Sequence, residues 1–216
     1  MKNLLFDNNN PDVKMFSYMM IAFFVLVAIG YVVYFLNEKK QYETGVLGKK
    51  RLDKMLRGYA KVRNFKVLSD VTITDGKSTM VADHILVGFF GVIIMSNLQG
   101  FGEYFGGNSL EQWSFLEKRS SNEKKETKPK VYLENPLFNL SKTEELVKRK
   151  LAAQKIYNIP LETFVVFSAP DGRVTYNGEK NPKLVAFSFF KKLLKNSQYE
   201  KDNNVDVVAI TELLDK

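Results

Sequence analysis

A magnesium-dependent phosphodiesterase requires carboxylates on neighbouring strands and a lysine close to them. The carboxylates bind the ion through hard oxygen atoms, and the lysine orients water or stabilises the charge of the pentacovalent phosphate. The candidate carboxylate in this chain is Asp83, which lies in the β-rich run at residues 81–87. A nuclease built on this chain would therefore need a second carboxylate and a lysine beside Asp83.

A hydrolytic triad has less support. Ser96, His84 and Asp83 are the right residue types, but Asp83 and His84 are consecutive, and successive side chains of a strand point to opposite faces. The chain has no Cys and one His, which excludes zinc fingers, disulfide scaffolds, thiol catalysis and iron–sulfur ligation. We expect no cofactor, and Mg²⁺ enters only under the nuclease hypothesis, with Asp83 as its one evident ligand.

The elements that would position this carboxylate are a helix and three successive strands. Apolar residues at helical spacing predict an amphipathic helix over residues 44–59. Two β-rich runs, 65–74 and 78–87, flank Asp75-Gly76, which is a strong hairpin motif. The apolar run at residues 91–95 predicts a buried third strand.

Helices and strands alternate in the second half of the sequence. Ser141-Lys142-Thr143-Glu144 is a capping box and predicts the start of a helix. Residues 117–130 are rich in Lys and Glu and contain no apolar residue, so they predict a solvated loop. The remaining predicted elements are a helix at residues 188–195 and strands at 103–105, 164–167 and 205–210. This order predicts an α/β fold with a mixed sheet flanked by helices.

An uncharged apolar run at residues 15–36 precedes these elements. As a helix it would be about 33 Å long, which is enough to cross a bilayer. The alternative is a cleaved signal peptide, but the run is too long, the segment before it is not basic, and Tyr34-Phe35-Leu36 is no small-residue cleavage site. Residues 1–14 have no net charge and residues 38–66 carry +7, so the positive-inside rule predicts a cytoplasmic C-terminal domain at the cell membrane.

The excess of basic residues is concentrated beside this apolar run. The chain has a formal charge of +8, but residues from 67 onward carry only +1. We therefore predict that the basic residues contact anionic lipid headgroups, at about 1 kcal/mol each, rather than nucleic acid. These residues are Lys39, Lys40, Lys49, Lys50, Arg51, Lys54 and Arg57. The predicted organisation is an extracytoplasmic segment, a transmembrane helix, a basic linker and an α/β domain, at residues 1–14, 15–36, 37–43 and 44–216.

Short motifs follow one another in a fixed order along residues 44–167. They are Asp83-His84, the strand at 91–95, the glycines Gly102 and Gly106, Trp113, and Asn135-Pro136-Leu137. In this order and spacing they resemble the nuclease-related domain family, NERD. The resemblance implies a restriction-endonuclease-like fold and a metal-dependent nuclease site that includes a Glu-x-Lys motif on the third strand.

The chain departs from that family at the positions that carry charge. Ser96 and Leu98 stand where the resemblance implies Glu and Lys, and Lys49 stands where it implies a helix glutamate. Alternation along the strand predicts Ser96 and Leu98 on one face, with Asp83 facing the same pocket. Leu98 can neither hold a charge nor donate a proton, so these degenerate positions predict a weakened or absent nuclease activity.

Three functions are compatible with these observations. The preferred one is a membrane-anchored, catalytically inactive domain that binds nucleic acid or a protein at the cytoplasmic face of the membrane, with membrane lipids as a further partner and no small-molecule cofactor. The second is a scaffold subunit of an envelope complex. The third is a divalent-metal-dependent nuclease with an altered site around Asp83, which two further carboxylates within reach of that residue would favour.

Overall fold

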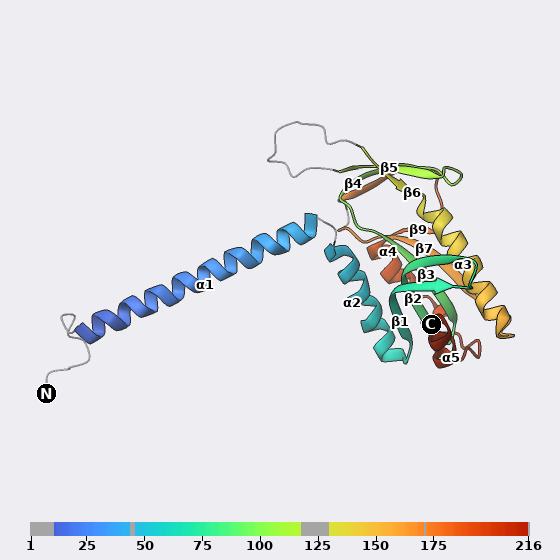
Figure 1. The fold of residues 1–216 in the computed structure, drawn as a ribbon, viewed down its shortest axis with the longest axis horizontal. Coiled ribbons are helices and arrows are strands. Elements are labelled where there is room, and N and C mark those ends of the chain that lie inside the picture. The colour runs from blue at the N-terminus through green and yellow to red at the C-terminus, as the bar shows by residue number, and fades with distance from the viewer. Residues whose placement is uncertain (1–10, 44–45, 118–129, 171, 216) are drawn as a thin grey trace. The chain divides into compact units, whose positions relative to one another are not determined.

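The computed structural model describes the chain apart from residues 1–10, 44–45, 118–129, 171 and 216, and it comprises two compact units, Met1–Glu43 and Thr44–Lys216. In the first unit, α1 (Pro11–Glu43) is one continuous helix, so residues 37–43, which the sequence assigned to a linker, are helical (Figure 1). The segment Lys14–Asn37 within α1 has a mean hydropathy of 2.6 and is long and apolar enough to span a membrane.

The second unit is built on a five-stranded sheet with the strand order β1-β2-β3-β7-β9. The first three strands form an antiparallel meander, whereas β7 pairs parallel with β3 and β9 pairs parallel with β7. The strands are β1 (Lys66–Thr74), β2 (Thr79–Gly88), β3 (Gly91–Leu98), β7 (Leu161–Phe167) and β9 (Leu184–Ala186). The sheet is therefore mixed, as the sequence predicted.

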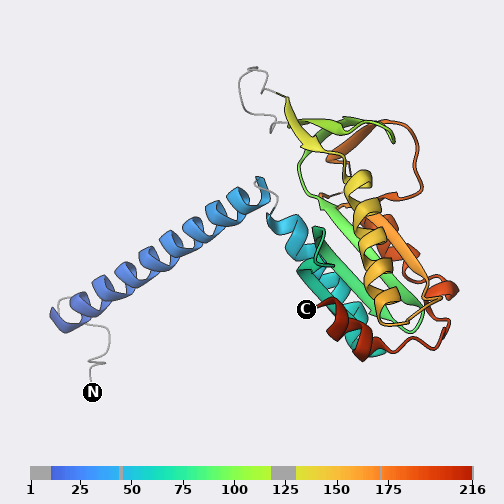
Figure 2. The ribbon, with the colours of Figure 1, turned by 45° about the vertical axis from the view of Figure 1, so that its right-hand side comes forward.

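Helices cover both faces of this sheet. On one face, α2 (Val46–Arg63) and α4 (Phe187–Leu193) share a core with β2 and β3, and Leu52, Leu56 and Ala60 of α2 enter it at four-residue spacing. On the other face, α3 (Pro136–Ala153) and α5 (Val207–Leu214) form a second core with β1 and β2. Figure 2 shows α3, in yellow, lying along the strands. The first of these two apolar layers fixes α2 against the strand that carries Asp83.

A second sheet of four strands has the order β6-β5-β4-β8 (Figure 1). Its strands are β4 (Gly102–Gly106), β5 (Gln112–Glu117), β6 (Val131–Glu134) and β8 (Val174–Gly178). β8 pairs parallel with β4, although a large part of the domain lies between them in the sequence. Tyr104, Trp113 and Phe167 form a third core that joins this sheet to the large one.

Two local predictions were wrong. The helix expected from the capping box at 141–144 begins earlier, as α3 at Pro136, because the Asn135 side chain accepts a hydrogen bond of 2.9 Å from Leu137 N. Residues 205–210, predicted as a strand, lead into α5, whose N-terminal amides are capped by Asp206. The predicted loop at 117–130 lies outside the described residues except at its two ends.

Candidate functional site

Asp70 and Asp83 lie opposite each other on β1 and β2. At this point the alternation of side chains between the two faces of the sheet is interrupted in both strands. The paired residues on either side are Ser69 with His84 and Val71 with Ala82. Residues three apart in each strand, Leu68 with Val71 and Ala82 with Ile85, face the same core, which regular alternation does not allow. Asp70 has a φ of 55°, in the left-handed region. This break in both strands brings the two carboxylates to the side of α2.

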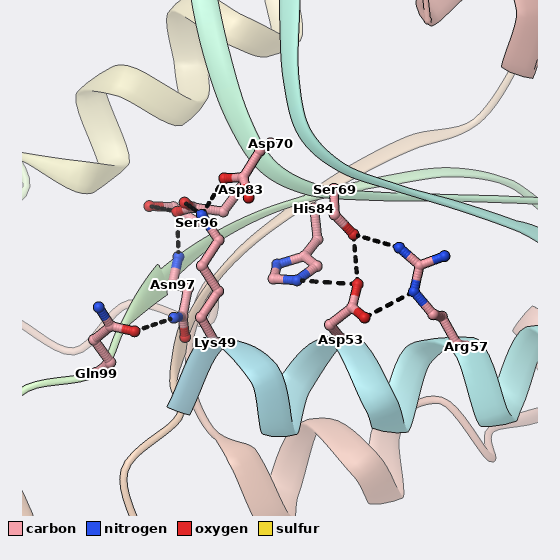
Figure 3. Close-up of polar contacts among 10 residues, drawn as sticks. All are labelled: Lys49, Asp53, Arg57, Ser69, Asp70, Asp83, His84, Ser96, Asn97 and Gln99. Atoms are coloured by element: carbon pink, nitrogen blue, oxygen red, sulfur yellow. Dashed lines mark hydrogen bonds and ion pairs between the residues drawn. The ribbon is translucent and has the colours of Figure 1, made fainter. Parts of the chain in front are cut away.

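Lys49, in the first turn of α2, forms ion pairs with both carboxylates. Its Nζ donates to Asp83 Oδ1 at 2.9 Å and also to Asp70 Oδ1 (Figure 3). Burial lowers the pKa of Lys49, but the hydrogen bonds and charges of Asp70 and Asp83 outweigh it, so the pKa lies above its ordinary value. At neutral pH the site therefore contains a fixed ammonium between two carboxylates.

The second oxygen of Asp83 is engaged by β3. Asp83 Oδ2 accepts a hydrogen bond of 2.8 Å from Asn97 N and lies 3.5 Å from Ser96 Oγ. Leu98, two residues further along, packs instead against apolar residues of two cores. The structure thus brings Lys49, Asp83 and Ser96 together with Asp70, and it leaves Leu98 in an apolar environment.

A second polar group lies one helical turn further along α2 (Figure 3). Asp53 accepts hydrogen bonds from Arg57 Nε at 2.7 Å and from Ser69 Oγ, and its Oδ1 lies 3.8 Å from His84 Nε2. Burial raises the pKa of Asp53, but these hydrogen bonds outweigh it and lower the pKa overall. The imidazole of His84 is fully buried, and burial lowers its pKa. At neutral pH Asp53 is therefore charged and His84 neutral.

The expectation that Asp83 and His84 point to opposite faces of their strand was wrong. Asp83 contacts Lys49 and His84 lies beside Asp53, so both side chains face the same helix. The cause is the interruption of alternation at this point in β2. A triad is nevertheless not assembled, because within the described part of the chain neither imidazole nitrogen of His84 has a hydrogen-bond partner.

Two of the residues at this site, Asp70 and Asp53, were missed by the sequence reasoning. The position of Asp53, four residues after Lys49, places both side chains on one face of α2 and could have indicated it. For Asp70 the sequence offers no such indication, because its role depends on a left-handed backbone conformation within a strand.

The carboxylates around Asp83 are already engaged by a cation of the protein itself. Mg²⁺ is bound through one or two carboxylates within a near-octahedral set of oxygen ligands, and at Asp70 and Asp83 it would have to displace the Lys49 ammonium. The described residues contain no group of three or more His, Cys, Asp or Glu side chains that could hold a metal. Among the described residues, one further carboxylate, that of Asp70, lies close to Asp83, whereas the nuclease hypothesis requires two.

The basic residues assigned to lipid contact have different environments. Lys49 and Arg57 are paired with carboxylates of the domain itself. The Arg51 guanidinium lies 4.2 Å from the centre of the Phe187 ring. Lys50 and Lys54 are exposed, and the side chains of Lys39 and Lys40 lie outside the described residues.

The domain is an α/β fold in which a mixed sheet lies between helices and an aspartate on its second strand faces a charged helix residue. Residues 44–168 match the family model described as nuclease-related domain, NERD, and the chain belongs to this family. No curated protein and no solved structure matched the chain.

Proposed function

We propose that this protein is a membrane-anchored nuclease-related domain that binds its ligand without cleaving it. The observation that carries the proposal is the ion-pair group of Lys49 with Asp70 and Asp83. The ammonium offsets one of the two negative charges and occupies the place between the carboxylates where a divalent cation would bind. Because Lys49 belongs to a helix packed through Leu52 and Leu56, its backbone cannot withdraw without disturbing a core.

The third strand supports the same proposal. A phosphodiesterase needs a cation close to the scissile phosphate, and the position that would supply it is Leu98, whose side chain packs among apolar groups. The cation that the site does contain, Lys49, is held by two carboxylates. The geometry therefore favours a function in binding over a function in catalysis.

The nuclease test uses the full-length protein in detergent with single- and double-stranded DNA and Mg²⁺ or Mn²⁺. We expect no cleavage above the background of a protein-free reaction, because a metal ion would have to displace the Lys49 ammonium from Asp83. An Asp83→Ala variant purified in the same way controls for contaminating nucleases. Metal-dependent cleavage by the original protein that is absent from Asp83→Ala would overturn the proposal in favour of an altered active site.

We further propose that α1 anchors the domain, with residues 38–216 in the cytoplasm. The proposal is supported by the exposed apolar segment Lys14–Asn37 and by the +7 charge of residues 38–66. Lys50 and Lys54, which are exposed, and Lys39 and Lys40 are the residues proposed to contact anionic lipid.

The orientation can be measured with single cysteines, since the chain has none. In intact cells a membrane-impermeant thiol reagent is expected to label Asn9→Cys and to leave Asn122→Cys unlabelled, because the positive-inside rule places only the N-terminus outside. Permeabilised cells provide the control, in which both positions must be labelled. Labelling of position 122 alone in intact cells would reverse the orientation.

A further inference from the structure

The four-stranded sheet has a second face that takes no part in the cores. Its inner face contributes Tyr104, Trp113 and Tyr176 to the third core. Alternation places the neighbouring residues on the outer face, and the strand register aligns four of them in one row across the sheet. From β8 to β6 this row is Asn177, Phe105, Ser114 and Tyr132.

Two aromatic side chains dominate this outer row. Tyr132 is 69% exposed, which is unusual for so large a ring. Phe105 is partly exposed, and Lys130 Nζ lies 4.9 Å from the centre of its ring. One strand separates the two aromatic residues, so their backbones are about 10 Å apart, at two strand spacings. The sheet thus presents two separated rings with an ammonium beside one of them.

We propose that this outer face binds single-stranded nucleic acid. Tyr132 and Phe105 stack on bases, and Lys130 contacts a phosphate. Aromatic rings on an open sheet accept unpaired bases because every base has a flat π-face, whereas the bases of a duplex are already stacked on one another. The inference rests on the proposed function, because it names the ligand that the domain is proposed to bind without cleaving.

The local charge matches this ligand better than the overall charge of the domain does. From residue 67 onward the net charge is only +1, so no large positive field is available. The sequence that joins β5 to β6 is nevertheless basic, with Lys118, Arg119, Lys124, Lys125 and Lys128 against Glu123 and Glu126. In the sequence, this excess of positive charge directly precedes Lys130.

Carboxylates on the same sheet limit the affinity. Glu103 lies on the outer face and accepts a hydrogen bond of 3.3 Å from Asn177 Nδ2, and Glu134 accepts one of 2.9 Å from Asn139 Nδ2. They repel phosphates, so stacking has to supply more of the affinity than ion pairing does. Substitution of an aromatic residue should therefore weaken binding more than substitution of Lys130.

The experiment measures fluorescence anisotropy of labelled oligonucleotides with the full-length protein in detergent. The probes are a 20-nucleotide oligo-dT, the matching oligo-U and a 20-base-pair duplex, which distinguish DNA, RNA and double-stranded ligands. We expect both single strands to bind more tightly than the duplex. Tyr132→Ala should weaken this binding about tenfold to a hundredfold, and Tyr132→Phe should retain it because the ring remains.

Val131→Ala is the matched control. Val131 is the neighbouring residue of β6, is 56% exposed and faces the other side of the sheet, so its loss should leave binding unchanged. Lys130→Ala should lower the affinity less and reduce the salt dependence by about one phosphate contact. The fluorescence of Trp113, the single tryptophan, reports whether each variant keeps the sheet folded.

The possible failures are distinguishable. Equal binding by the original protein, Tyr132→Ala and Phe105→Ala would show that this surface is not the binding site. A preference for the duplex would show that the ligand is not single-stranded nucleic acid. The absence of nucleic-acid binding would overturn this inference. It would not affect the proposal that the domain does not cleave its ligand, which the nuclease test addresses separately. Metal-dependent cleavage would overturn the proposed function whatever the outcome for Tyr132.

Discussion

Replacing Lys49 with glutamate is expected to make the stability of the domain depend on divalent cations. The variant would place a third carboxylate against Asp70 and Asp83, and like charges in one group disfavour the folded state. We expect a loss of about 1–3 kcal/mol in the free energy of unfolding, less than for a fully buried pair, because the three side chains are 29%, 64% and 30% exposed. Mn²⁺ or Mg²⁺ bound to the carboxylates of the folded state should restore part of it.

Thermal unfolding in a chelator and in Mn²⁺, together with titration calorimetry, checks this expectation. Lys50→Glu is the matched control, since it makes the same charge change at the next residue, which is exposed. Only Lys49→Glu should gain stability from the metal and show heat of binding. An identical response of the two variants would mean that the position of Lys49 between the carboxylates is irrelevant to cation binding.

The same ion pairs have a defined pH dependence. The pKa of Lys49 is raised in the folded state, so its contribution to stability is present below the unfolded value of about 10.4 and is lost as the pH rises through the folded value. At pH 7 the ammonium is fully charged. The comparison of Lys49→Glu with Lys50→Glu is therefore best made near neutral pH, where the original protein retains the whole contribution.

Gly106→Ala is expected to destabilise the small sheet strongly. A Cβ at Gly106 would overlap the ring of Trp113, which is fully buried and donates a hydrogen bond of 3.1 Å from Nε1 to Gly107 O. The ring has little room to move, because it packs against Tyr176 at 5.1 Å between ring centres. We expect a loss of about 2–3 kcal/mol, the upper part of the range for overpacked cores.

Gly107→Ala provides a control at the adjacent position. A Cβ there would meet Leu110 Cγ at 3.6 Å, which is an ordinary contact, so we expect a change below about 0.5 kcal/mol. Chemical denaturation followed by Trp113 fluorescence and by circular dichroism measures both variants. Equal stabilities would show that the Trp113 ring is free to shift and that the small sheet is packed more loosely than its third core indicates.

Four of the five strands of the large sheet could be predicted from the sequence because their signals are local, whereas the three-residue β9 was not predicted. The hairpin around Asp75-Gly76 and the apolar run of β3 each specify an element without reference to the rest of the chain. The run at 205–210 shows the limit of such signals, because a short apolar segment fits a buried strand as well as a helix. The capping residue, Asp206, is the better indicator, because aspartate is typical of the start of a helix.

Most of the small sheet and the partner of Asp83 could not be predicted in this way, although the strand expected at residues 103–105 is present as β4. β8 is short, and it pairs with β4, which is distant in the sequence. No local sequence pattern therefore predicts it. Asp70 faces Lys49 because the backbone adopts a left-handed conformation in the middle of β1, and strict alternation would have turned its side chain away. Asp83 was found from the sequence because the residue itself lies in a recognisable motif, whereas its environment depends on pairing across strands.

The segment that matches the family model ends at residue 168, but the folded unit does not. β8 completes the small sheet and β9 completes the large one, and Phe190, Tyr199 and Ile210 fill the two cores from beyond that point. A fragment cut at the family boundary would therefore expose two unpaired strand edges beside uncovered apolar faces, the combination that drives chains to aggregate. Recombinant expression of the domain should accordingly extend through Leu214.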